Sequence, residues 1–204
     1  MTVPRGVNRT AVLRPSRAVA EAYERGVAPV CDATGHHYSI SDWFLTYGFA
    51  EVHDGLLIGA YPLDATDVAM LGTMHIEQIL NLVEDQEYAP GRRFVVETAL
   101  HQAGIGEERM SLTDFGRLPA DRLEPAVQKV VGWMRHGRLT YVHCRAGWQR
   151  SAAVAAGAIA IYDGLSIDEA LAYIRRRKPS AEPLPHQRQD LLTWWAERSG
   201  LHRR

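Results

Sequence analysis

One segment restricts the fold of this chain more than any other, residues 141–151, which read YVHCRAGWQRS. Before it, Leu139 to Val142 is short and rich in β-branched and aromatic residues. After it, Ala152 to Tyr162 is apolar, rich in alanine and free of proline. This pattern predicts a strand, a tight turn and a helix, with Cys144 in the turn. Such a turn presents the free N–H groups of the helix N-terminus, which together with the helix dipole favour an anion.

The spacing between Cys144 and Arg150 indicates what this anion site does. Arg150 stands six positions after the cysteine, so its guanidinium can fold back and bind an oxyanion through two parallel hydrogen bonds. A thiol beside a helix N-terminus and an arginine loses its proton well below the free-cysteine pKa of about 8.5. The loop would therefore hold an oxyanion, for which phosphate is suited, and place a thiolate against its central atom. The alternative is a buried structural cysteine, because free cysteine is among the most often buried residue types.

The pattern His-Cys-x5-Arg-Ser at residues 143–151 resembles the signature loop of the cysteine-dependent protein tyrosine phosphatases, in particular the compact dual-specificity group. Sulfurtransferases of the rhodanese type have a similar loop that is typically one residue shorter, so the spacing favours phosphate. The resemblance extends over about residues 50–198 and is closest to the branch that contains phosphatidylglycerophosphate phosphatase. Three stretches carry it, LTDFGRLP (112–119), YVHCRAG (141–147) and RSAAVAAGAIAIYDGLSIDEAL (150–171).

The resemblance implies a role for each residue of the loop. Cys144 would be the nucleophile, and Arg150 would bind two phosphate oxygens and stabilise the transferred group. Ser151 would hydrogen-bond the thiolate when water cleaves the phosphocysteine, and His143 would orient the loop rather than act as a base. Gly147 would let the backbone approach the anion closely. The residues expected to form the phosphate site are His143, Arg145, Ala146, Gly147, Trp148 and Gln149.

A carboxylic acid is needed on the opposite side of the substrate, because an expelled alkoxide or phenoxide requires a proton. Asp114 is the candidate, since it lies in a loop marked by glycine and proline that follows a predicted strand and can close over a site. In dual-specificity phosphatases the acid typically lies about thirty residues before the nucleophile, and Asp114 precedes Cys144 by thirty. The alternative is an aspartate that caps its own turn. Asp85 and Asp121 are the fallback acids.

Strands and helices alternate along the chain, which predicts an α/β fold with a central, mostly parallel sheet flanked by helices, as in the dual-specificity phosphatases. The expected strands are 49–53, 56–60, 76–83, 108–112 and 139–142, with Asp54-Gly55 as a hairpin turn between the first two. The expected helices are 64–74, 92–103, about 119–136, 152–162, 167–177 and 185–198. Ligands bind at the carboxyl ends of the strands in such sheets, where Cys144 and Asp114 are both expected.

The N-terminal part of the chain differs in character from the rest. The sequence predicts an N-terminal extension at 1–48 and a phosphatase domain at 49–200. Within the extension, 1–17 is expected to be a solvated basic arm and 18–26 a short helix. Residues 31–41 contain a cysteine and two histidines but are expected to form a surface loop. Adjacent histidines point in different directions, and no second ligand pair has a zinc spacing.

Composition limits the partners and the location of the protein. A net charge of −1 gives no support for binding nucleic acid. The two cysteines do not make a disulfide framework and fit a reducing cytoplasm, so a cytoplasmic location is expected. No apolar run reaches the roughly 18 residues of a membrane span, and no hydrophobic signal segment follows the N-terminal arginines, so stable membrane insertion is not expected. No metal or cofactor is expected.

Three functions remain open at this stage. The first is a phosphatase acting on phosphoproteins, phosphotyrosine in particular. The second is the same chemistry on a phospholipid, a phosphoinositide or another small phosphate ester. The third is a phosphate-binding module without turnover, which is disfavoured because nucleophile, arginine and acid are all present. Lipid-directed relatives often carry lysine or arginine where Trp148 stands, and an aromatic wall there fits an aryl or a lipid-glycerol substrate. The oligomeric state is left open.

Overall fold

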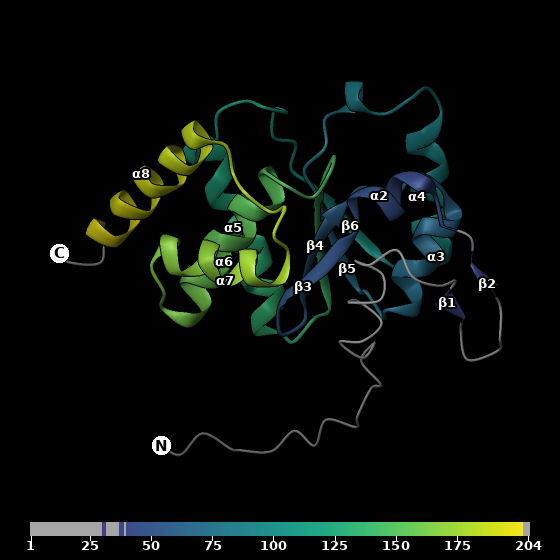
Figure 1. The fold of residues 1–204 in the computed structure, drawn as a ribbon, viewed down its shortest axis with the longest axis horizontal. Coiled ribbons are helices and arrows are strands. Elements are labelled where there is room, and N and C mark those ends of the chain that lie inside the picture. The colour runs from purple at the N-terminus through teal and green to yellow at the C-terminus, as the bar shows by residue number, and fades with distance from the viewer. Residues whose placement is uncertain (1–29, 32–36, 39, 202–204) are drawn as a thin grey trace, which may run out of the picture.

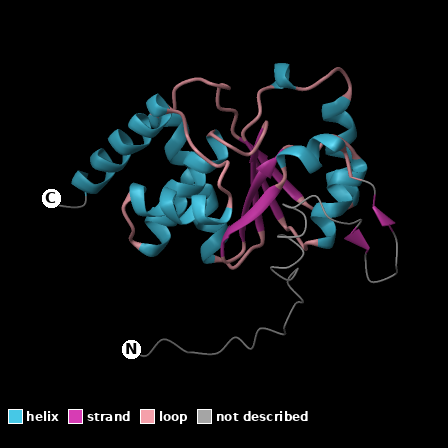
Figure 2. Cartoon of the chain, viewed as in Figure 1, coloured by secondary structure: helices cyan, strands magenta, loops and turns pink. Residues whose placement is uncertain are grey.

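A computed structural model of the protein describes residues 30–31, 37–38 and 40–201. Five strands form one sheet in the order β3-β4-β7-β5-β6 (Figures 1 and 2). β3 pairs antiparallel with β4, and the other pairings are parallel, which confirms the predicted mostly parallel sheet. The strand bounds are β3 Phe49–His53, β4 Leu56–Ala60, β5 Gln78–Asn81, β6 Gly106–Arg109 and β7 Thr140–Cys144.

Helices cover both faces of this sheet (Figure 1). Ile79 and Tyr141 belong to the apolar cluster between the sheet and the helices of one face. Leu80 and Val142 belong to the cluster between the sheet and the helices of the other face. Neighbouring residues of a strand thus face opposite sides of the sheet, which explains the uninterrupted apolar run of β4 and the apolar centres of β5 and β7. The helices on the face of Ile79 and Tyr141 are α2 (Asp42–Tyr47), α3 (Ala65–Thr73) and α4 (Arg92–Gln102). Those on the face of Leu80 and Val142 are α5 (Ala120–Arg135), α6 (Arg150–Asp163), α7 (Ile167–Arg177) and α8 (Pro185–Leu201).

β7 and α6 form the centre of the molecule. β7 lies between β4 and β5, and all five of its residues are buried. The first eleven residues of α6 are buried as well, and a Cβ on Gly157 would come within 2.8 Å of the Val127 side chain of α5. The alanine-rich composition of α6 therefore serves close packing. Within the described residues no single helix is long and apolar enough to cross a membrane; α6 and α7 pass that test only as a pair, bent by 117°.

Most predicted elements lie within a few residues of the observed ones, and β6 shows why some are shifted. The strand predicted at 108–112 is observed at Gly106–Arg109. Gly106 pairs with Gln78 of β5, and a Cβ on Gly106 would lie 2.7 Å from the Gln78 side chain. The strand thus begins two residues earlier than predicted, at Gly106, where a larger residue would have to displace the end of the Gln78 side chain.

The region before β3 also departs from expectation. The loop expected at 31–41 contains two short antiparallel strands, β1 (Val30–Cys31) and β2 (His37–Tyr38). The expected arm at 1–17 and helix at 18–26 lie outside the described residues. The division into 1–48 and 49–200 stays a prediction, but α2 lies before its boundary and is packed against the sheet. Phe44 of α2 is fully buried beside Phe49 and Tyr141, with ring centroids 5.7 and 6.5 Å away.

Candidate active site

The loop between β7 and α6 is held against β4 by two glycines. Gly147 has a φ of 74°, and a Cβ on it would lie 2.4 Å from the carbonyl carbon of Gly59. Gly59 has no room either, since a Cβ there would lie 2.2 Å from the Tyr141 hydroxyl. The amide N–H of Tyr61 also donates to the carbonyl of Arg145 over 3.2 Å. Gly147 was expected to admit an anion, and the structure shows that it also lets the loop lie directly on β4.

Cys144 is the last residue of β7, and its thiol is free. Its side chain is buried, and its Sγ lies 3.4 Å from the Ser151 hydroxyl. Burial alone would raise the pKa of the thiol. The positive charge of Arg150, the hydroxyl and N–H of Ser151 and the N–H of Gln149 outweigh burial, so the pKa is lowered. The thiolate is therefore the favoured form of a nucleophile at this position.

Arg150, the first residue of α6, is the most constrained charge of the site. Its side chain is fully buried and makes a two-pronged ion pair with the carboxylate of Glu87, with distances of 2.7 and 2.8 Å. Nη1 also donates to the carbonyl of Leu112 over 2.8 Å. Nη2 lies 2.8 Å from Oδ1 of Asp114. Nε is buried and has no hydrogen-bond partner among the described residues, so one side of the guanidinium is left for an added anion.

Asp114 lies next to the cysteine, as the sequence predicted. Its loop is joined to the segment after β5, where Glu84 accepts hydrogen bonds from the Thr113 hydroxyl and the Asp114 amide over 3.1 and 3.3 Å. The fallback acids lie elsewhere. Asp85 is largely exposed and pairs with Arg109, and neither Asp85 nor the exposed Asp121 lines the pocket.

His143 lies behind the loop and does not face the pocket. It is 1% exposed, and its pKa is lowered to about 3, because burial disfavours the charged form. The charges of Arg93, Arg150 and Arg109 add to this, against one hydrogen bond with the Cys144 backbone. His143 is therefore neutral at ordinary pH and cannot reach a substrate, which fits the structural role expected for it.

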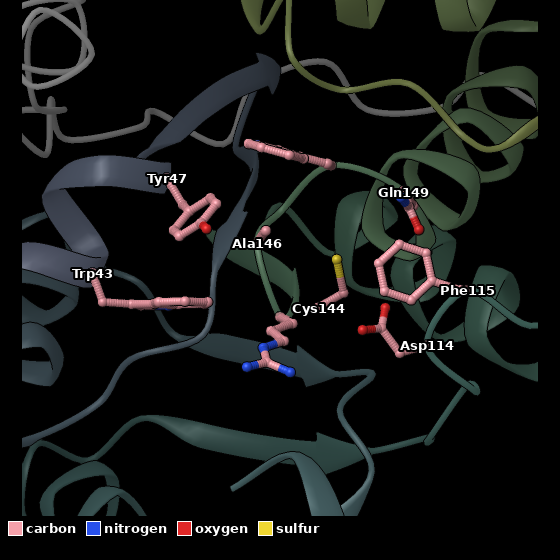
Figure 3. Close-up of a pocket in the computed structure, with 9 residues that line it drawn as sticks. Trp43, Tyr47, Asp114, Phe115, Cys144, Ala146 and Gln149 are labelled. Atoms are coloured by element: carbon pink, nitrogen blue, oxygen red, sulfur yellow. The ribbon is translucent and has the colours of Figure 1, made fainter. Parts of the chain in front are cut away.

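A pocket of about 260 Å³ opens above the cysteine. Figure 3 shows the Cys144 sulfur at its floor, with Trp43 and Tyr47 on one side and Asp114 and Phe115 on the other. Four residues expected at the site are not among those that line the pocket, Ser151, Arg150, His143 and Gly147. The nine lining residues are Trp43, Tyr47, Asp114, Phe115, Cys144, Arg145, Ala146, Trp148 and Gln149.

The aromatic wall of this pocket was not predicted in full. Trp43 and Tyr47 come from α2, in the part assigned to the extension, and their ring centroids are 4.3 Å apart. The Tyr47 ring lies 5.2 Å from that of Trp148. The Arg145 guanidinium lies 5.7 Å above the Trp43 ring. The buried Lys178, which follows the last residue of α7, donates to the Tyr47 carbonyl over 2.9 Å and holds this wall in place. Two aromatic residues four positions apart were the available signal, since such residues share one face of a helix.

Glu87 is the second residue that the sequence did not identify. It stands in the acidic segment EDQE at 84–87, which has the composition of an exposed loop, yet its side chain is only 6% exposed. Burial alone would raise the pKa of Glu87, but hydrogen bonds and the charge of Arg150 lower it. The available signal was its position directly after a buried parallel strand, at the edge of the sheet where Cys144 lies.

No group of three histidine, cysteine, aspartate or glutamate residues within the described part of the chain is placed to hold a metal ion. The chemistry that the residues offer is that of a buried thiolate, an arginine with one free donor and a carboxyl group facing both. Such a set binds an oxyanion, attacks it and supplies a proton to what leaves.

Comparison with known proteins agrees with this geometry. A family profile described as the catalytic domain of dual specificity phosphatases matches residues 57–197. Phosphatidylglycerophosphatase and protein-tyrosine phosphatase 1 of Mus musculus is 26% identical over 159 residues, which are 76% of this chain and 78% of that protein. Dual specificity protein phosphatase 15 of Mus musculus is 28% identical over 158 residues, 76% of this chain and 62% of that protein.

Solved structures share the fold. The crystal structure of PTPMT1 in complex with PI(5)P has a TM-score of 0.66 at 23% identity and covers 76% of this chain and 98% of that one. Tk-PTP in the active form has a TM-score of 0.61 at 22% identity, covering 71% of this chain and 95% of that one. The fold class predicted from the sequence is thereby confirmed.

Proposed function

The chain belongs to the dual-specificity phosphatase family and is a cysteine-dependent phosphatase; from this premise we propose that it hydrolyses aryl phosphate monoesters, with phosphotyrosine in proteins as the preferred class. The observation that carries the proposal is the lining of the pocket. Four of its nine residues are aromatic, Trp43, Tyr47, Phe115 and Trp148, and they stand above the Cys144 thiol. An aryl ring between such side chains gains apolar burial and ring contacts that an alkyl chain of serine or threonine lacks.

The size of the pocket supports the same choice. Pockets that enclose a drug-sized ligand are typically about 300–1,000 Å³. At about 260 Å³ this one admits the end of a substrate, such as a phosphate and one ring, while the rest stays outside. Protein phosphotyrosine presents such an end on a long, narrow side chain.

Binding begins with an exchange of anions at Arg150. The phosphate dianion takes the backbone N–H groups at the start of α6 and the free Nε of Arg150. It replaces the Asp114 carboxylate beside Nη2, where that carboxylate lies 2.8 Å away without substrate. Glu87 keeps its two hydrogen bonds from the far side, so the guanidinium need not move.

The first chemical step transfers the phosphoryl group to sulfur. The Cys144 thiolate attacks phosphorus, and the bond from phosphorus to the phenolic oxygen breaks. Asp114, which takes up a proton from solvent once the phosphate has displaced it from Arg150, donates that proton to the phenolic oxygen. Arg150 and the loop N–H groups bind the equatorial oxygens as charge spreads over them. The products of this step are a phenol and a phosphocysteine.

The second step regenerates the thiolate. Water attacks phosphorus from the position that the phenol has left, and Asp114, now ionised, accepts a proton from it. The bond between sulfur and phosphorus breaks, and inorganic phosphate leaves. The Ser151 hydroxyl, 3.4 Å from Sγ, stabilises the returning thiolate.

Two variants and a substrate panel test this proposal. Cys144→Ser should abolish hydrolysis of para-nitrophenyl phosphate while vanadate still binds, and full turnover would disprove the mechanism. Asp114→Asn should slow phenyl phosphate far more than para-nitrophenyl phosphate, because the poorer leaving group needs the proton. In the panel, kcat/KM for a phosphotyrosine peptide should exceed that for its phosphothreonine counterpart, and Trp148→Ala should reduce the difference. Equal values for the two peptides would refute the aryl preference.

A lipid substrate is the second candidate, and the name of one relative supports it. The mouse protein whose name includes phosphatidylglycerophosphatase shares 26% of its aligned residues with this chain, and the exposed Phe115 and Trp148 at the pocket mouth can contact acyl or glycerol carbons. Vesicles containing phosphatidylglycerophosphate or a monophosphorylated phosphoinositide should therefore join the panel. A kcat/KM above that of the phosphotyrosine peptide would make lipid the substrate class.

A further inference from the structure

The first turn of α8 contacts the loop that carries Asp114, although no residue of α8 lines the pocket. Nε2 of His186 lies 3.1 Å from the carbonyl oxygens of both Phe115 and Gly116. Because both partners are acceptors, Nε2 must carry the proton. The buried Gln187 donates from Nε2 to the same Gly116 carbonyl over 3.0 Å, while its Oε1 accepts the amide N–H of Leu184 at the start of α8.

The next turn of α8 holds the other end of the loop. Asp190, which is 9% exposed, accepts the amide N–H of Leu118 at Oδ2 over 2.8 Å. Its Oδ1 lies 2.5 Å from a guanidinium nitrogen of Arg117. Four successive positions of the loop, from Phe115 to Leu118, are thus bound by side chains of one helix.

The conformation of the loop requires such support. Phe115 has a φ of 55°, in the left-handed region that bulky residues avoid, and its side chain is 66% exposed. A strained residue of this kind persists only when its surroundings favour it. The ring of Phe115 is too exposed to supply this support. The hydrogen bond from His186 to the Phe115 carbonyl acts directly on the strained unit.

Resting on the proposed function, we propose that His186, Gln187 and Asp190 of α8 are positioning residues for the general acid. They hold residues 115–118 in the conformation that places Asp114 over Cys144, so that α8 controls protonation of the leaving group from outside the pocket. Glu84 holds the opposite side of the loop through the Thr113 hydroxyl and the Asp114 amide. The loop that carries Asp114 is thus held from two sides, by Glu84 and by α8. The contacts from α8 are the ones that stabilise the strained conformation of Phe115.

Loss of the α8 anchor should affect one step of the reaction and spare the rest. The nucleophile, the arginine and the loop N–H groups at the start of α6 are held by Gly59 of β4 and by Glu87. By contrast, α8 packs against α6 further along, where Trp194 lies beside Gly157. General acid catalysis contributes about 10²–10⁴-fold, and a displacement of about 1 Å can cost 10²-fold. A partly released loop should therefore lose about tenfold on a substrate that needs the acid.

The experiment compares variants of α8 on two substrates and in two backgrounds. His186→Ala removes a half-exposed donor, and Gln187→Glu keeps the shape and the acceptor for Leu184 while removing the donor to Gly116. Gln189→Ala is the matched control, since the exposed Gln189 bonds only Thr193 on the same helix. Each is measured with phenyl phosphate and para-nitrophenyl phosphate, alone and combined with Asp114→Asn.

The expected result is a loss of about tenfold on phenyl phosphate for His186→Ala and Gln187→Glu, less than twofold on para-nitrophenyl phosphate, and none for Gln189→Ala. Combined with Asp114→Asn, neither variant should cost anything further, because the acid through which it acts is gone. His186→Gln, which restores an N–H donor, should recover part of the rate. If Gln187→Glu unfolds, His186→Ala decides alone.

Two results overturn the inference while leaving the proposed function standing. One is an equal loss on both substrates, and the other is a loss that persists in the Asp114→Asn background; either would show a general effect of α8 on the fold. Unchanged rates in both variants would also overturn it. If Asp114→Asn alone matches the wild type on phenyl phosphate, the acid role itself has failed, and that outcome is seen before any α8 variant is compared.

Discussion

Replacing Glu87 by glutamine tests how the phosphate-binding arginine is held. Glu87 and Arg150 are joined by two short hydrogen bonds between side chains that are 6% and 0% exposed. Removing one partner of a buried ion pair typically costs about 3–5 kcal/mol, because the other charge is left without compensation. Here Asp114 and the Leu112 carbonyl still contact the guanidinium, and glutamine keeps one acceptor. We therefore expect Glu87→Gln to lower the free energy of unfolding by the lower end of this range, about 3 kcal/mol.

This free energy translates into measurable shifts. In domains of about 150–250 residues, 1 kcal/mol lowers Tm by about 2–4 °C, so Glu87→Gln should melt about 6–12 °C below the wild type at neutral pH. A guanidinium displaced by about 1 Å should reduce kcat/KM for para-nitrophenyl phosphate by about 10²-fold. Asp85→Asn is the matched control, because Asp85 is 81% exposed and a surface pair is worth about 1 kcal/mol or less.

The dependence on pH gives the reasoning a second test. Burial would raise the pKa of Glu87, but Arg150 lowers it below its ordinary value of 4.5. A carboxyl group whose pKa is lower in the folded than in the unfolded state stabilises the protein at pH values above its unfolded-state pKa. This stabilisation is lost as the pH falls through the folded-state pKa. Urea unfolding should thus show the full difference between wild type and variant at pH near 7 and a smaller one below about pH 4.5. Equal stability of the two at neutral pH, or a gap unchanged by acid, would refute the ion pair as the source.

Four further outcomes are expected. Gly147→Ala should lower kcat/KM by about 10²-fold, since the new Cβ would lie 2.4 Å from Gly59 at a φ of 74° and displace the loop; wild-type rates would contradict this contact. Ser151→Ala should slow breakdown of the phosphocysteine, seen as a burst of phenol in rapid-quench measurements, and a linear time course would oppose that role. The rate at which iodoacetamide alkylates Cys144 should rise with pH to a midpoint below the free-thiol pKa of about 8.5, because the thiolate is the reactive form and the pKa of this thiol is lowered. Arg150→Met should raise that midpoint, since it removes the positive charge beside the thiol. EDTA should leave the initial rate unchanged, as every proposed step uses side chains alone; inactivation would point to a metal.

Features encoded by neighbouring residues were predictable from the sequence. The Asp54-Gly55 turn fixed both strands of the first hairpin, and α7 begins and ends where its capping box and basic last turn indicated. Cys144 and Arg150 were identified because the loop that joins them is local. Asp114 needed the resemblance as well, since a turn aspartate alone has another ready explanation.

Features formed by distant segments were missed. Glu87 lies sixty-three positions before its partner, and its place after a buried strand indicated the edge of the sheet but not the ion pair with Arg150. Trp43 precedes the signature loop by about a hundred residues and was assigned to the extension. The hydrogen bonds from α8 to the acid loop join residues about seventy positions apart. Each such contact depends on how the helices are arranged around the sheet, and periodicity along one segment carries no information on that arrangement.

The place of α2 has a consequence for how this enzyme can change. The family profile begins at residue 57, so the nucleophile, the arginine and the acid lie inside it, whereas Trp43 and Tyr47 lie outside. The reacting groups therefore lie in one part of the chain, and two of the four aromatic residues of the pocket lie in another, α2, which is anchored by Phe44, by the Tyr47 carbonyl and by the hydrogen bonds of its N-cap Ser41 with Asp67. An exchange of α2 between relatives, with Phe44 retained, should transfer preference among substrates while the rate on a small aryl phosphate is conserved. This short helix is accordingly the natural starting point for redesigning what the enzyme accepts.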